Sequence, residues 1–205
     1  MKNLFLIIFT LISINVFATF QTPDKIIIDN NEFSLTTYPF EKYFELYPDK
    51  RPKSISTSLH RGYLAIYEVI NNEIYLKDIK VEYQENNQNI IQLKSIMNEL
   101  FPNKKLIKID WISSILIGYK GLFTSHINNY TLLEINNGLV NEMKEFSDYK
   151  SYNKFVKQQY KLFEKTTDFE LIKENFFVDN PNIKKSKIRK MLKNNILKYS
   201  THFLD

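Results

Sequence analysis

The chain has 205 residues and a net charge of +5, and it contains no cysteine, four glycines and six prolines. This length suits one domain that buries a core of its own. The lack of cysteine excludes disulfides, thiolate metal sites, a cysteine nucleophile and a lipoprotein anchor, and the spacing of the glycines excludes the common phosphate-binding loops.

Residues 1–18 have the pattern of a secretory signal peptide. A lysine at position 2 precedes an apolar run from Leu4 to Ile14, and Val16 and Ala18 are the small residues before a cleavage site. The run is shorter than the roughly 20 residues that a membrane-spanning helix needs. We therefore expect cleavage after Ala18 and an exported protein, either periplasmic or secreted. The bias toward Lys, Ile and Asn is typical of a low-GC bacterium.

Three segments place apolar, β-branched residues on both sides of a short turn. The turns are Asn30-Asn31, Asn71-Asn72 and Asn137-Gly138. Asparagine and glycine tolerate the positive φ angles that two-residue hairpin loops require. The pattern therefore predicts three β-hairpins, over 25–33, 67–75 and 133–140.

The middle hairpin also predicts a pairing register. With the loop at its two asparagines, Ala65 lies opposite Asp78, and Glu68 lies diagonal to Lys77 and can form an ion pair with it. Apolar residues then occupy both faces of the two strands. We therefore expect this hairpin to lie at the centre of a sheet that is covered on both sides.

Shorter elements are predicted between the hairpins. Residues 39–47 form a short helix with proline at its first turn, and residues 90–100 form a helix that ends before Pro102. Residues 105–117 form a strand with a bend near Ser113-Ser114.

Helical periodicity follows the third hairpin. Ser147 can cap a helix over 148–165, Thr167 begins a capping-box pattern, and Asn180-Pro181 precede a last helix. The sequence therefore predicts an α+β protein, with a mostly antiparallel β-sheet built from hairpins. We expect a β-rich core domain over 19–146, and C-terminal helices over 147–205 that are packed on it or appended to it.

The excess positive charge lies at the C-terminus. Residues 180–205 hold seven basic residues and one acidic residue, whereas 19–179 hold 20 basic and 22 acidic residues. Basic side chains flank the apolar stripe of the last helix: Lys184, Lys185, Lys187, Arg189, Lys190 and Lys193. The segment 181–199 can therefore bind an anionic membrane surface. Lysine in place of arginine argues against specific nucleic-acid binding, and a docked helix with solvated lysines is the alternative.

The sequence contains no clear catalytic motif. Its three histidines lack the spacing of a metal site, and no serine lies in a nucleophile motif. Glu68, Asp78 and Asp110 are weak catalytic candidates, because apolar neighbours indicate partial burial and a raised carboxyl pKa. Two such acids can hydrolyse a glycosidic bond, although ion-paired sheet residues are the alternative. We expect no metal and no cofactor.

Several short motifs resemble those of a group of uncharacterised bacterial proteins. The chain has YPFEKYF at 38–44, SLHRGYLA at 58–65, YLKDI at 75–79, FP at 101–102 and DW at 110–111. The group carries YPLEPYF, TALWRGYxATWEI, LYLxDI and a later FP…DW. The resemblance implies a shared fold over about 25–145 and no known activity. It marks Gly62 as a position of interest, together with four weak candidates for binding: Arg61, Tyr63, Asp110 and Trp111.

These features predict an exported, non-enzymatic binding protein whose partner is another protein or an envelope component. One alternative is a carboxylate-based hydrolase of envelope polymers that uses Glu68, Asp78 or Asp110. A second alternative is an adaptor that its basic C-terminal helix holds at a membrane surface.

Overall fold

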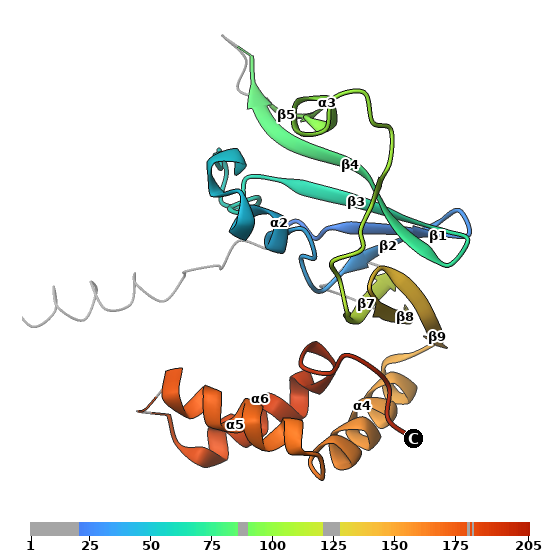
Figure 1. The fold of residues 1–205 in the computed structure, drawn as a ribbon, viewed down its shortest axis with the longest axis vertical. Coiled ribbons are helices and arrows are strands. Elements are labelled where there is room, and N and C mark those ends of the chain that lie inside the picture. The colour runs from blue at the N-terminus through green and yellow to red at the C-terminus, as the bar shows by residue number, and fades with distance from the viewer. Residues whose placement is uncertain (1–20, 86–89, 121–127, 180, 182) are drawn as a thin grey trace, which may run out of the picture.

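The computed structural model describes residues 21–85, 90–120, 128–179, 181 and 183–205. The predicted signal peptide lies outside these ranges. Within them, nine strands form one mostly antiparallel sheet and the long helices lie in the C-terminal third, so the predicted α+β class is confirmed (Figure 1). None of the helices in these ranges is long and apolar enough to cross a membrane.

The sheet curls into a closed path of strands. Its strands are β1 (Lys25–Ile28), β2 (Asn31–Leu35), β3 (Leu64–Ile70), β4 (Glu73–Gln84), β5 (Ile91–Ser95), β6 (Ile107–Lys108), β7 (Ser114–Lys120), β8 (Asn128–Asn136) and β9 (Leu139–Phe146). Their order is β3-β1-β2-β7-β8-β9-β4-β5, and β3 also pairs with β4. Seven strands thus close on themselves, while β5 and β6 pair with β4 outside this path.

In the described part of the chain, five helices accompany the sheet, and the C-terminal ones lie together below it in Figure 1. The five are α2 (Glu41–Leu46), α3 (Met97–Leu100), α4 (Tyr149–Phe163), α5 (Thr167–Asp179) and α6 (Lys185–Asn195), with single 3-10 turns η1 (Pro48–Lys50) and η2 (Ile196–Lys198). The predicted helix at 39–47 is therefore present. Asp148 rather than Ser147 caps α4, since its carboxylate accepts a hydrogen bond from the Ser151 N–H at 2.8 Å.

The hairpin predictions are confirmed, with one loop displaced. Asn71-Asn72 and Asn137-Gly138 occupy their loops with positive φ angles. In the first hairpin the loop is Asp29-Asn30, one residue earlier than predicted. Aspartate tolerates the left-handed conformation as asparagine does, and this loop pairs Ile26 with Phe33, both buried in the core.

The predicted register of the middle hairpin holds only near its loop. The register shifts between Ile66 and Tyr67, where Lys77 is the extra residue on β4, so Ala65 pairs with Ile79 rather than with Asp78. Asp78 then lies on the same face as Glu68, and that face carries charged, partly exposed side chains. The prediction that both faces are apolar and covered is therefore wrong, whereas the ion pair between Glu68 and Lys77 is confirmed at 3.1 Å.

Residues 90–100 are not one helix, which corrects the prediction. β4 extends to Gln84, and residues 80–84 pair with β5 on the edge of β4 opposite to β3, since Lys80 pairs with both Leu64 and Ser95. The unpaired backbone groups of β4 need partners, and this tertiary demand overrides the helical pattern. The predicted strand over 105–117 is divided into β6 and β7, with the break before Ser114, where the bend was expected.

Two apolar clusters hold the fold together. The first lies inside the curled sheet and reaches α2 and α3, with Ile26, Phe40 and Tyr67 fully buried. The second joins β7 and β8 to the C-terminal helices, which lie together below the sheet in Figure 1, and buries Leu132 and Ile188 completely. The C-terminal helices are therefore packed on the sheet.

Candidate functional site

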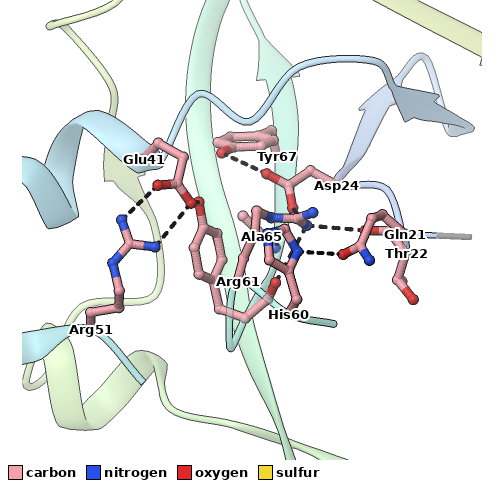
Figure 2. A network of polar contacts seen from close by, with 10 residues as sticks. Gln21, Thr22, Asp24, Glu41, Arg51, His60, Arg61, Ala65 and Tyr67 are labelled. Atoms are coloured by element: carbon pink, nitrogen blue, oxygen red, sulfur yellow. Dashed lines mark hydrogen bonds and ion pairs between the residues drawn. The ribbon is translucent and has the colours of Figure 1, made fainter. Parts of the chain in front are cut away.

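A buried ion pair ties the chain before β1 to the start of β3 (Figure 2). The Arg61 Nη2 lies 3.1 Å from the Asp24 Oδ1, and the two side chains are 4% and 0% exposed. Asp24 also accepts hydrogen bonds from the Ala65 N–H at 3.1 Å and from the Tyr67 hydroxyl at 3.5 Å. Arg61 donates further to the Thr22 carbonyl at 3.0 Å. These contacts fix the segment that precedes β1 against β3.

Burial dominates the ionisation of this pair. It raises the pKa of Asp24 from 3.8 to about 7, although Arg61 and the hydrogen bonds from Ala65 and Tyr67 favour the charged form. The Asp24 carboxyl therefore changes charge within the folded protein near neutral pH.

We expect this ionisation to make stability fall as pH rises. Between the unfolded pKa of 3.8 and the folded value of about 7, the native protein keeps a proton that the unfolded chain releases. The stabilisation from the raised pKa is thus complete below 3.8 and lost as pH rises to about 7. Urea denaturation measures the unfolding free energies of wild type and of Asp24→Asn. The wild-type value minus the variant's value should decrease as the pH rises over this range. Glu41, whose pKa is lowered, acts in the opposite direction but is common to both proteins.

A difference that stays constant or grows with pH would show that Asp24 is ionised throughout. Denaturation in the same buffers at matched ionic strength keeps salt screening equal in the two proteins.

A second polar group lies next to the first. Both terminal nitrogens of Arg51 donate to Glu41, at 2.6 and 3.2 Å, and the Tyr63 hydroxyl donates to the same carboxylate at 2.9 Å. Burial raises the pKa of Glu41, but the hydrogen bonds from Arg51 and Tyr63 outweigh it and the pKa is lowered. Burial also raises the pKa of Tyr63, so its phenol remains a hydrogen-bond donor.

Tyr38 covers the buried arginine. The guanidinium carbon of Arg61 lies 3.5 Å from the centre of the Tyr38 ring, a cation–π contact. Among the described side chains, the buried polar atoms that make no hydrogen bond are Thr36 Oγ1, Thr37 Oγ1, Arg61 Nε and Nη1, and Trp111 Nε1. Thr37 precedes Tyr38 in sequence, and Arg61 contacts its ring. Thr36 lines the first pocket described below and Trp111 the second, and Tyr38 lines both. Buried polar atoms without partners are rare, and each needs an explanation.

Two pockets meet at Tyr38 and Lys198, which line both. The larger has a volume of about 360 Å³ and lies between β2 and β7 on one side and α4, the end of α6 and η2 on the other. The smaller has a volume of about 230 Å³ and lies between residues 37–42 and residues 111–116. The site thus forms where the sheet meets the C-terminal helices.

The walls of these pockets combine aromatic, apolar and uncharged polar groups. In the larger pocket the tyrosines are Tyr38, Tyr119 and Tyr152, and the amide and hydroxyl groups belong to Gln21, Thr36, Asn194 and Asn195. The Gln21 amide is held in place by the Thr57 carbonyl at 2.6 Å and by the His60 ring at 2.6 Å. The charged side chains are Lys198 in both pockets and Lys42 in the smaller one, and neither wall includes aspartate or glutamate.

The three predicted catalytic acids lie away from these pockets. Glu68 pairs with Lys77 and Asp78 with Lys80, both on the partly exposed face of β3 and β4. Asp110 is exposed between β6 and β7. None of the three lines a pocket described above.

The candidate binding residues have different roles. Arg61 and Tyr63 are buried and line neither pocket. They pack against Tyr38 and Phe40 and so support the pocket wall from behind. Trp111 lines the smaller pocket itself. Asp110, the residue before Trp111, lines neither pocket.

The basic residues of α6 face solvent, while its apolar stripe is docked. Ile188, Leu192 and Ile196 are fully buried. The basic side chains described as exposed are Lys184, Lys187, Arg189, Lys190 and Lys193, and the side chain of Lys185 lies outside the described set. Arg189 pairs with Glu164 at 3.1 Å. The stripe is therefore not available for insertion into a membrane.

Sequence reasoning did not identify Asp24, Tyr38 or Lys198 as site residues. An acid directly before an apolar strand, as at Asp24, is a weak signal of a buried pair. Tyr38 opens the YPFEKYF motif, which supports the resemblance and a helix prediction but carries no signal of a binding role. Lys198 belongs to the basic C-terminal segment, and only the packing of η2 brings it to the pockets.

Comparison with known proteins gives no match: no protein-family model, curated protein or solved structure matches the chain. The resemblance to the bacterial group with YPLEPYF motifs therefore stays a prediction. Within the ranges that the structure describes, no group of three or more His, Asp or Glu side chains could hold a metal ion.

Proposed function

We propose that the chain is an exported, non-enzymatic binding protein whose ligand occupies the two pockets that meet at Tyr38 and Lys198. The observation that carries this proposal is the gathering of buried polar atoms without partners around these pockets. A largely apolar pocket with a few polar groups is the usual form of a small-molecule site. Export rests on the predicted signal peptide.

The positions of the acids support binding rather than hydrolysis. A glycosidase needs two carboxyl groups about 5–9 Å apart across a cleft. The walls of both pockets lack acids, and Glu68 and Asp78 have lysine partners on another surface. The burial of Leu192 and its neighbours likewise gives the membrane-adaptor alternative no support.

A neutral fluorescent probe tests the proposal. N-phenyl-1-naphthylamine brightens in apolar pockets, and we expect it to bind the predicted mature chain, Thr19–Asp205. Asn194 is exposed at the wall of the larger pocket, so Asn194→Trp should fill the opening and weaken binding at least about tenfold, the loss of one or two good contacts. Fluorescence titration measures both affinities.

Lys190→Trp is the matched control. Lys190 is exposed on the same helix and lines neither pocket, so this variant should bind the probe as wild type does. Equal binding by both variants, or no binding by wild type, would contradict the proposal. Thermal denaturation of each variant verifies that the fold is retained.

A further inference from the structure

We infer that the ligand of these pockets is a small organic anion, with an apolar or aromatic body and one negatively charged group that pairs with Lys198. This inference rests on the proposed function and adds the charge and the anchoring residue. Four features of the described structure support it: the free charge of Lys198, the donors in the walls, the apolar surface and the size of the cavities.

The charge of Lys198 is not neutralised within the described protein. None of the ion pairs there includes Lys198, and its side chain lines both pockets. Lys42 adds a second ammonium group in the smaller pocket, where it donates to the Trp111 carbonyl at 3.1 Å. Because neither wall contains an acid, an anionic group there meets attraction without opposing repulsion.

The polar groups of the smaller pocket favour an acceptor. The Trp111 indole N–H can only donate, and the Thr37 hydroxyl can donate, and both are without a partner in the protein. A carboxylate or sulfonate offers only acceptor oxygens, and hydrogen bonds to ionised acceptors are the strong ones. A cationic ligand would face two lysines.

The apolar side chains of the larger pocket suit a ligand with a small apolar body. Leu35, Ile117, Val156 and Leu197 line the larger pocket together with its tyrosines. A volume of about 360 Å³ lies in the range of small-molecule sites. The exposed lysines of α6, whose last residues line this pocket, add to the positive charge on this side of the molecule.

A matched pair of probes separates charge from shape. 1-Anilinonaphthalene-8-sulfonate has the ring system of N-phenyl-1-naphthylamine with one added sulfonate. We expect wild type to bind the sulfonate probe more tightly than the neutral probe. Lys198→Gln should weaken the sulfonate probe about tenfold, the range of one charge-assisted hydrogen bond, and affect the neutral probe far less, because glutamine keeps part of the side chain's contact with it.

Lys193→Gln removes the same charge from the same helix at an exposed position outside both walls. It should leave sulfonate binding nearly unchanged at moderate salt. Equal losses in the two variants would overturn the inference, because general attraction to a basic surface would then explain the binding. A neutral probe that binds as tightly as the sulfonate, and is blocked by Asn194→Trp, would overturn the inference and keep the proposed function. Failure of both probes to bind would contradict both.

Discussion

Arg61→Met is expected to lower the free energy of unfolding at neutral pH by about 1.5–3 kcal/mol, the cost of losing charge-assisted hydrogen bonds to a buried carboxyl that takes up a proton once Arg61 is gone. Asp24 is completely buried, and its other hydrogen bonds come only from an N–H and a hydroxyl. The loss of the cation–π contact with Tyr38 adds to the effect. Urea denaturation followed by circular dichroism measures it.

The matched control is Arg51→Met, which breaks a more exposed ion pair. Arg51 and Glu41 are 34% and 31% exposed, and such pairs contribute about 1 kcal/mol or less. The loss for Arg61→Met should also be smaller in acid, because Asp24 is then neutral. If Arg61→Met costs no more than Arg51→Met, the buried pair does not hold the fold.

Gly138→Ala is expected to cause the second large loss, about 2–4 kcal/mol from an unfavourable left-handed backbone and a steric clash. Gly138 has a φ of +77°, and an added Cβ would lie 2.0 Å from the Ile109 carbonyl oxygen. The Gly138 carbonyl also accepts the Ile74 N–H at 2.9 Å, a bond that closes the curled sheet between β4 and β9. Relief of the clash would therefore disturb this closure.

Asn72→Ala provides the comparison. Asn72 occupies the same position of its own hairpin loop with a φ of 60°, so alanine there meets the backbone cost of about 1 kcal/mol alone. Equal losses in the two variants would mean that the backbone at Ile109, which follows β6, moves away freely.

The hairpins could be predicted because their signals are local. Asn137-Gly138 and its neighbours contain both the turn and the strands that it joins. The bulge at Lys77 could not be predicted, because it depends on which face of β4 the closed sheet buries. The strand at Ile91–Ser95 was misread as helix for a related reason: its partner is the free edge of β4, which the local sequence does not reveal.

The candidate site depends still more on distant contacts. Asp24 and Arg61 are 37 residues apart, and no spacing rule links them. Tyr38 and Lys198 meet only because α6 and η2 pack against β7. The residues that hold the site, Arg61 and Tyr63, could be singled out from the sequence, whereas most of the side chains that form its walls could not.

The most direct test of the account is the indole N–H signal of Trp111 in a nitrogen-15 NMR titration. Trp111 is the single tryptophan of the chain and lines the smaller pocket, so its indole signal needs no further assignment. Addition of N-phenyl-1-naphthylamine should shift this signal in wild type and in Lys190→Trp, and shift it clearly less at the same probe concentration in Asn194→Trp. The new indole in each variant is identified by comparison with wild type. An unchanged Trp111 signal at a probe concentration that saturates the fluorescence would show that the probe binds elsewhere and would contradict the pockets at Tyr38 and Lys198 as the binding site.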